Sequence, residues 1–323
     1  MKPINGIRRV AVLGLGTMGH GIAQTFALAG YDVACFDESA SVRDSLVGRV
    51  RENLAAFVAA ELVGPEQVGP TLARLSLTDS EDEAVAGAEF LTEAIPEDLA
   101  VKQALLARLE RITAPETILA SNSSSFPISH SGRLLQHPER ALVTHWFNPP
   151  HLTPVIEVVP SPLTSEAVVQ TTMQILAGIG KLPIPVRREL PGFLVNRVQV
   201  AIQREVWDLL ERGVATREEI DAAIRGTIGF RFAVMGPLEI HDFAGLDIQL
   251  ATYRNLVGEI RSDTSPPGVL DELVASGHLG IKSGRGFYDH PPERLVARRI
   301  RRDSLLLKLW KLLYHPACGD ETS

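Results

Sequence analysis

The stretch of sequence that decides the fold is Gly14-Leu15-Gly16-Thr17-Met18-Gly19, which has the spacing G-x-G-x-x-G. It joins an apolar run, Arg9–Leu13, to an amphipathic segment, Gly19–Gly30, so it connects a predicted strand to a predicted helix. In such a loop the first glycine permits a tight turn, the second lets the backbone approach a pyrophosphate, and the third allows helix and strand to pack closely. We therefore expect the loop residues to bind a dinucleotide at the helix N-terminus.

An acidic residue further along the chain supports this interpretation. Asp37 ends the next predicted strand, Asp32–Phe36, about twenty residues after the loop, where a carboxylate binds the ribose hydroxyls of a dinucleotide. Glu38 follows, and two negative charges would repel the 2′-phosphate of NADP, so the sequence predicts NAD as the cofactor. The alternative interpretation is a glycine turn that binds no nucleotide.

The alternation of strands and helices continues through the first half of the chain. Long helices are predicted over Ala40–Val63 and from Pro65 on. Further predicted strands are Phe90–Ile95, Ile118–Ser121, Ala141–His145, Val155–Val159 and Pro183–Val186. This order predicts an α/β fold with a Rossmann-type doubly wound parallel sheet.

After Pro191 the apolar periodicity is helical throughout. The predicted helices are Gly192–Arg212, Thr216–Arg225, Pro237–Glu259, Pro267–Ser276 and Arg294–Leu313. We therefore predict an NAD-binding domain over residues 1–188 and an all-helical C-terminal domain over residues 189–323. The arginine-rich run from Arg294 to Arg302 has the pattern of a solvated helix face, and we assign no function to it.

The composition excludes several classes of protein. Hydrophobic residues make up 45% and charged residues 22%, as in ordinary globular chains. The net charge of −7 is unfavourable for binding nucleic acid, because phosphate contacts need a basic face. The sequence contains neither an apolar run of membrane-spanning length nor a secretory signal. The two cysteines, Cys35 and Cys318, predict neither a disulfide framework nor a thiolate metal site, so we expect a cytoplasmic protein without a metal.

Two neighbouring predicted strands carry a histidine and a glutamate. His145 ends one apolar strand, and Glu157 lies in the middle of the next, Val155–Val159. A carboxylate within an apolar strand is costly unless it has a partner, and His145 is the obvious candidate. The carboxylate would fix the tautomer of the imidazole, whose other nitrogen could then take a hydroxyl proton. A buried pair that serves only the fold is an equally good interpretation at this point.

Two more polar groups lie near predicted element ends. The run Ser121-Asn122-Ser123-Ser124-Ser125 follows a strand at the carboxyl edge of the sheet, where open α/β folds bind ligands. One of these serines could instead cap a following helix. Asn196 lies on an otherwise apolar helix face after Pro191, where an asparagine is often a structural hydrogen bonder.

These motifs together resemble the 3-hydroxyacyl-CoA dehydrogenase superfamily from Arg9 to about His290. The stretches that carry the resemblance are GLGTMGHGIAQ, EAIPEDLAVK, SNSSS, THWFNPP, VIEVV, PGFLVNR, GPLEIHDFAGLD and GIKSGRGFYD. The resemblance implies an NAD-dependent dehydrogenase in which His145 is the base and Glu157 orients it. It further implies that Ser124 hydrogen-bonds the reacting oxygen, that Asn196 helps to hold that oxygen or the histidine, and that the helical domain forms a homodimer. Cofactor contacts are implied for Glu97, Lys102 and Asn122.

The resemblance extends to two branches of the superfamily, which imply different classes of substrate. In the acyl-CoA branch, the long helix after the second strand carries a serine and lysines that meet the CoA phosphates. Here that stretch is Asn53–Glu61, in which alanines replace them, and the chain has no lysine between Lys2 and Lys102. Several charge-assisted contacts, each worth about 1.5–3 kcal/mol, would be missing.

Other stretches are similar to the L-gulonate 3-dehydrogenase, or lambda-crystallin, branch: NPPHLTPVIEVVP, NRVQVAIQREVW, GFRFAVMGPLE and ARRIRRDSLLLKL. Within the third stretch, Arg231 could bind a substrate carboxylate, or could stack on Phe230 or Phe232. We therefore favour a free, gulonate- or carnitine-like or unusual L-3-hydroxy acid. The alternatives are an ordinary L-3-hydroxyacyl-CoA substrate, with arginines such as Arg49 and Arg51 binding CoA, and a non-catalytic NAD-binding protein.

Overall fold

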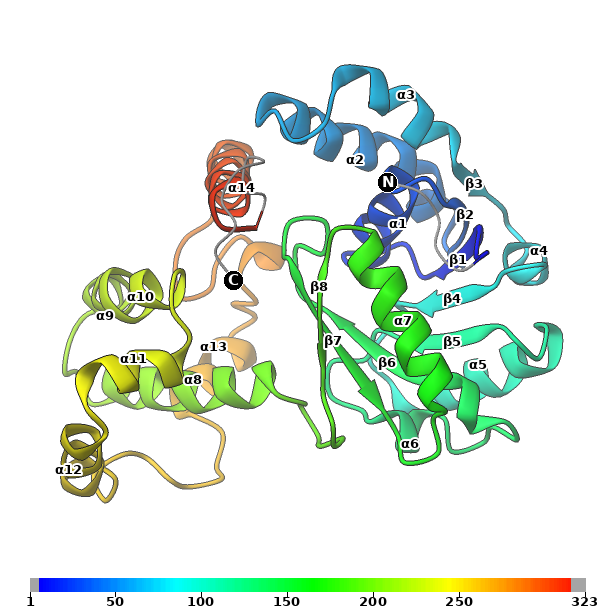
Figure 1. Ribbon diagram of the computed structural model, residues 1–323. Coiled ribbons are helices and arrows are strands. Elements are labelled where there is room, and N and C mark those ends of the chain that lie inside the picture. The colour runs from blue at the N-terminus through cyan, green and yellow to red at the C-terminus, as the bar shows by residue number, and fades with distance from the viewer. Residues whose placement is uncertain (1–5, 315–323) are drawn as a thin grey trace. The chain divides into compact units, whose positions relative to one another are not determined.

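The computed structural model describes residues 6–314, and its chain divides into two compact units (Figure 1). The first unit ends at Asn196 and includes the chain again from Ile300 on, and the second comprises Arg197–Arg299. The limits differ from the predicted domains, 1–188 and 189–323, because residues at the end of the last helix pack back onto the first unit. The predicted domain division stays a prediction.

The first unit contains an eight-stranded sheet in the order β3-β2-β1-β4-β5-β6-β7-β8. Its strands are β1 (Arg9–Leu13), β2 (Asp32–Phe36), β3 (Leu75–Leu77), β4 (Phe90–Glu93), β5 (Ile118–Ser121), β6 (Ala141–Trp146), β7 (Val155–Pro160) and β8 (Leu182–Pro185). All pairs are parallel except β6 with β7, which is antiparallel. The short connection over residues 147–154 explains this exception, since a parallel pair would need a longer crossover.

Helices cover both faces of the sheet, which explains why its strands are apolar on both sides. The helices of this unit are α1 (Gly19–Leu28), α2 (Ala40–Ala59), α3 (Pro65–Ala73), α4 (Glu81–Val85), α5 (Leu99–Ile112), α6 (Ile128–Ser131) and α7 (Glu166–Gly178). Along β1, Val10 and Val12 pack with α1, α2 and α7, whereas Ala11 and Leu13 pack with α4, α5 and α6. The predicted Rossmann-type α/β fold is confirmed.

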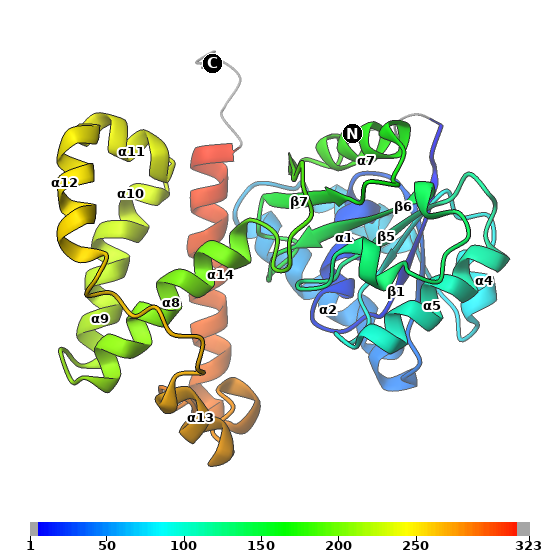
Figure 2. The same cartoon turned by 90° about the horizontal axis from the view of Figure 1, so that it is seen from below.

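The second unit is helical and has almost no core of its own. Its helices include most of α8 (Val195–Glu211), then α9 (Arg217–Ile224), α10 (Phe230–Phe232), α11 (Pro237–Ala244), α12 (Leu246–Leu256), α13 (Gly268–Ala275) and the start of α14 (Pro292–Tyr314) (Figure 2). The predicted single helix Pro237–Glu259 is wrong, because Gly245 has φ of +93° and divides it. Apart from Pro267, Ile220 is the one apolar side chain within 197–299 that is buried.

The end of α14 packs against the end of α2, and both segments belong to the first unit. Leu307 is buried in a cluster with Phe57, Val63 and Leu152. Next to this cluster, the ammonium of Lys311 lies 2.9 Å from the carboxylate of Glu61 and lowers the pKa of that carboxyl. Residues 300–314 therefore form a cover over one end of α2.

No helix within residues 6–314 is long and apolar enough to cross a membrane. The same residues contain no group of three or more histidine, cysteine or acidic side chains that could bind a metal. Cys35 is buried as a free thiol, and Cys318 lies outside the described residues.

Candidate active site

The glycine loop has the geometry that a dinucleotide requires. Gly14 has φ of +85°, and a Cβ at this position would lie 2.7 Å from the carbonyl oxygen of Ala94, so the turn needs glycine. A Cβ on Gly19 would lie 1.7 Å from the carbonyl oxygen of Gly14. A Cβ on Gly16 would meet no protein atom within 4 Å, so open space lies beside this residue. This space, next to the N-terminus of α1, fits a pyrophosphate.

The other loop residues and Asp37 lie where the sequence analysis expects them. Leu15 is buried, Thr17 is exposed, and Met18 packs against the core below the loop. The carboxylate of Asp37 accepts a 2.8 Å hydrogen bond from the backbone N–H of Leu15, which keeps it beside the loop at the end of β2. A ribose placed over the loop would therefore meet this carboxylate.

The candidate base lies at the carboxyl end of β6, directly opposite Glu157 in the antiparallel register. The Nδ1 atom of His145 lies 2.7 Å from Oε2 of Glu157, and both side chains are buried. The His145 ring also contacts Phe147 and Phe193, with centroid distances of 4.4 and 5.5 Å. Because Nδ1 faces the carboxylate, Nε2 is the nitrogen left to take a proton.

The second oxygen of Glu157 binds the backbone at the start of α8. Its Oε1 accepts hydrogen bonds from the N–H groups of Leu194 at 3.0 Å and Val195 at 2.8 Å. The turn that presents these groups contains Gly192 and Phe193, with φ of +75° and +50°. Glu157 therefore holds the histidine and the helix start together, and three donors compensate for the burial of its charge.

The serine loop after β5 is held by Glu97. A single oxygen of this carboxylate, Oε1, accepts hydrogen bonds from the hydroxyls of Ser123, Ser124 and Ser125 and from the N–H groups of Ser124 and Ser125, at 2.7–3.3 Å. Partial burial would raise the pKa of Glu97, but these hydrogen bonds and the charge of Lys102 outweigh it, and the pKa falls below its usual value. Glu97 thus stays ionised and fixes the loop.

Two asparagines connect this loop to its neighbours. The side chain of Asn196 donates to the carbonyl oxygen of Ser124 at 3.0 Å. The side chain of Asn122 accepts from the N–H of Trp146 at 3.0 Å, immediately after His145. The structure therefore brings the predicted residues Ser124, Asn196 and Asn122 to the same edge of the sheet as the His145–Glu157 pair.

A buried ion pair lies beneath the serine loop. The ammonium of Lys102 lies 2.9 Å from both carboxylate oxygens of Glu93 and 3.5 Å from Glu97, and the hydroxyl of Ser121 donates to Glu93. Lys102 is connected to the serine loop by its contact with Glu97. A direct contact between Lys102 and the cofactor stays a prediction. Glu93 is not among the residues predicted from the sequence, although an acid at the end of an apolar strand gives the same signal as Glu157.

The remaining predicted site residue lies in the second unit. Arg231 is exposed on α10, and its Nε donates to the carbonyl oxygen of Thr227 at 3.3 Å. Its predicted contact with a substrate carboxylate stays a prediction.

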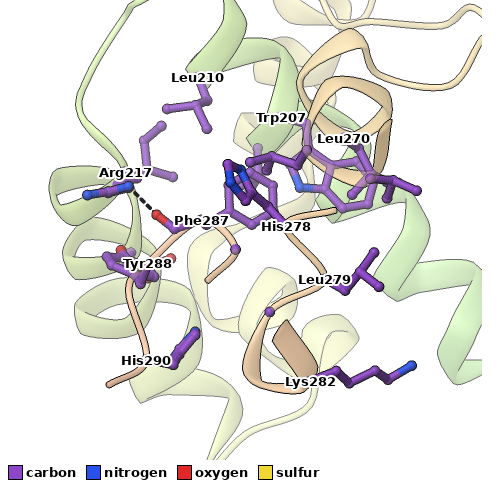
Figure 3. Close-up of a pocket in the computed structure, with 17 residues that line it drawn as sticks. Trp207, Leu210, Arg217, Leu270, His278, Leu279, Lys282, Phe287, Tyr288 and His290 are labelled. Atoms are coloured by element: carbon purple, nitrogen blue, oxygen red, sulfur yellow. Dashed lines mark hydrogen bonds between the residues drawn. The ribbon is translucent and has the colours of Figure 1, made fainter. Parts of the chain in front are cut away.

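A cavity of about 570 Å³ also lies within the second unit, between α8, α9, α13 and residues 278–290 (Figure 3). Its apolar lining includes Trp207, Leu210, Leu270 and Phe287. At one side, Arg217 donates to the carbonyl oxygen of Phe287. The cavity contains none of the residues around His145.

Two protein-family profiles match the chain. The profile described as 3-hydroxyacyl-CoA dehydrogenase, NAD binding domain, matches residues 9–190, and the profile for the C-terminal domain of the same enzymes matches residues 192–290. The chain belongs to the 3-hydroxyacyl-CoA dehydrogenase family. Its cofactor is accordingly NAD, and it is a dehydrogenase that acts on a CH–OH group.

The relatives in this family carry different substrates in their names. L-Carnitine dehydrogenase of Streptomyces griseus is 41% identical over 304 residues, which cover 91% of this chain and 88% of that protein. 3-Hydroxyadipyl-CoA dehydrogenase of Escherichia coli is 37% identical over 89% of this chain, which spans 60% of that protein. The crystal structure of a 5-formyl-3-hydroxy-2-methylpyridine 4-carboxylic acid 5-dehydrogenase, described as an NAD⁺-dependent dismutase, superimposes with a TM-score of 0.89. It is 32% identical and covers 95% of this chain and 98% of that one.

The loop geometry predicts different effects for two Gly→Ala substitutions. We expect Gly16→Ala to weaken NADH binding at least ~10-fold without loss of stability, because its Cβ would fill only the open space that the pyrophosphate needs. Gly19→Ala should instead destabilise the fold, since its Cβ would overlap the Gly14 carbonyl. Fluorescence titration with NADH and thermal unfolding would measure both effects.

Gly69→Ala on α3 is the matched control, because its Cβ also meets no atom within 4 Å but lies away from the loop. A Gly16→Ala variant that binds NADH as tightly as Gly69→Ala would contradict this assignment.

Proposed function

We propose that the protein oxidises a free L-3-hydroxy acid to the 3-keto acid with NAD, and that a CoA thioester is not its substrate. The observation that carries this proposal is the cover formed by residues 300–314 over the end of α2. The family resemblance places the CoA phosphate contacts on this helix. Here Ala56 and Ala60 pack against the cluster that contains Phe57 and Leu307, while Ala55 and Ala59 are exposed. Part of the surface that would carry the CoA contacts is therefore occupied by α14.

Of the two arginines that could replace the missing lysines, Arg51 is exposed on α2, whereas Arg49 has other contacts. The guanidinium of Arg49 donates to the carbonyl oxygens of Leu15 at 2.7 Å, Gly16 at 3.2 Å and Val42 at 3.2 Å. Burial lowers the pKa of Arg49, while the charge of Asp37 opposes that fall. A cation that stabilises the glycine loop in this way is poorly placed to bind a CoA phosphate, which supports a substrate without CoA.

The residues of the site suit proton abstraction from a hydroxyl. NAD, when bound at the glycine loop, supplies the acceptor for the hydride that leaves C3. Nε2 of His145 takes the hydroxyl proton, and Glu157 stabilises the resulting imidazolium through Nδ1. The hydroxyl of Ser124 turns from its 3.3 Å contact with Glu97 to donate a hydrogen bond to the reacting oxygen, and Asn196 keeps the Ser124 backbone in position. Arg231 binds the substrate carboxylate.

A homodimer is part of the proposal. Large apolar side chains of the second unit are strongly exposed, including Phe230 at 74%, Leu238 at 81% and Phe243 at 80%. Exposed apolar surface of this extent is typical of an interface, and a second copy of the chain would supply the missing core. We keep the cytoplasm as the proposed location, consistent with the free Cys35 thiol.

The substrate proposal predicts a preference in a defined panel of compounds. We expect NAD-dependent turnover of at least one free acid among L-carnitine, L-gulonate and L-3-hydroxybutyrate. Its kcat/KM should exceed that for L-3-hydroxybutyryl-CoA at least ~10-fold, because the CoA nucleotide would meet α14 and would lack at least one charge-assisted phosphate contact, whereas the free acid needs neither. NADH absorbance is the measurement, and efficient turnover of the CoA ester alone would overturn the proposal.

The proposed base predicts a large loss on substitution. His145→Gln should lower kcat by ~10²–10⁴-fold with NADH affinity nearly unchanged, because general base catalysis has this range of effects. His137→Gln is the matched control, since His137 pairs with Glu139 at 3.2 Å but both side chains are exposed. Equal activity of the two variants would remove His145 from its proposed role.

The dimer proposal is tested by the mass of the chain in solution. We expect sedimentation equilibrium to give twice the chain mass, and Leu238→Glu combined with Phe243→Glu to give the single-chain mass. The same double change at two exposed apolar residues of the first unit, Leu134 and Leu163, is the control and should leave the dimer intact. A wild-type monomer would contradict the proposal.

A further inference from the structure

A buried lysine outside the predicted site binds the loop that joins β6 to β7. Lys181 lies between α7 and β8 and is 8% exposed. Its ammonium donates to the carbonyl oxygens of Pro150 at 2.7 Å, Thr153 at 2.8 Å and His151 at 3.4 Å. All three acceptors belong to residues 147–154, so the one ammonium group binds three carbonyl groups of the same loop.

The contacts of Lys181 are those of a charged donor. An ammonium has three N–H groups, and three carbonyl oxygens accept from it. Nζ also lies 5.6 Å from the centroid of the Trp146 ring. Burial lowers the pKa of Lys181 to about 7. A hydrophobic side chain of similar length would fill the same space but leave these carbonyls without a donor.

The loop held by Lys181 joins the two halves of the site. It runs from the strand of His145 to the strand of Glu157. Its middle packs against α1, because a Cβ on Gly21 would lie 2.7 Å from Pro150 and 2.8 Å from Nδ1 of His151. The His151 ring also lies 5.9 Å from the ring of His20.

His20 connects this contact to the glycine loop. Its Nδ1 lies 2.8 Å from the carbonyl oxygen of Gly16. A continuous set of contacts therefore runs from Lys181 through the loop and α1 to the residues that bind the pyrophosphate.

We infer that Lys181 is a positioning residue for hydride transfer: by fixing residues 147–154 it sets the distance between the NAD loop and His145. The effect on NAD follows from the family assignment, and the effect on His145 rests on the proposed function. Lys181 touches neither cofactor nor substrate in this inference and acts only through the loop.

The test compares Lys181→Met with Arg140→Met. Arg140 is also buried, and it donates to the carbonyl oxygens of Glu110 and Ala114 and to the hydroxyl of Thr113, away from residues 147–154. Both variants should lose stability, since each leaves buried carbonyls without donors. Only Lys181→Met should weaken NADH binding, by ~10-fold, and lower kcat. Hydrogen exchange should accelerate at the amides of Leu152 and Thr153, which bind the Pro149 carbonyl.

The outcomes separate a positioning role from a structural one. If Lys181→Met binds NADH like the wild type, or if Arg140→Met loses the same affinity, the inference is wrong. If Lys181→Met does not fold, Lys181→Gln, which keeps two N–H donors, takes its place and should show a smaller change in the same direction. NADH binding is measured without a substrate, so failure of the substrate proposal would leave this result intact.

Discussion

The site depends on one buried carboxylate. Glu157 is fully buried in the sheet, and its two oxygens bind His145 on one side and the first N–H groups of α8 on the other. Removing one partner of such a charge costs about 3–5 kcal/mol, so the carboxylate constrains both partners strongly. The position of the base is thereby tied to the point where the chain leaves the sheet, and neither can shift alone.

Carboxylates that bind several donors also fix the serine loop. Glu93 is a buried carboxylate at the end of β4, as Glu157 is within β7. Lys102 compensates the buried charge of Glu93 and also lies near Glu97. Glu97 then gathers the N–H and hydroxyl groups of the serine loop on one oxygen. Loops at the edge of a parallel sheet have few backbone partners of their own. Ionised carboxylates that collect several donors give these loops the fixed geometry that a reaction site needs.

Most of the fold was predictable because its signals are local. Strand composition and the glycine spacing depend on neighbouring residues, whereas β3 was missed since its three residues include one buried side chain. The His145–Glu157 pair was predictable because a carboxylate in an apolar strand requires a partner. The roles of Glu97 at the serine loop and of Lys181 at the loop 147–154 were not predictable. Their partners lie 26 to 31 residues away along the chain and are largely backbone groups, which carry no sequence signal.

The alanines of α2 show why substrate class can depend on packing remote from the base. In the sequence, these alanines indicate only that phosphate-binding lysines are absent. In the fold Ala56 and Ala60 pack against the cluster in which Leu307 is buried, whereas Ala55 and Ala59 are exposed, and the proposal of a substrate without CoA rests on the first two. His145, Glu157 and Ser124 require only a hydroxyl group to act on, and these residues are compatible with either substrate. In the proposed function, the choice between a thioester and a free acid therefore depends on what covers α2 and on the cation available for a carboxylate, not on the catalytic pair.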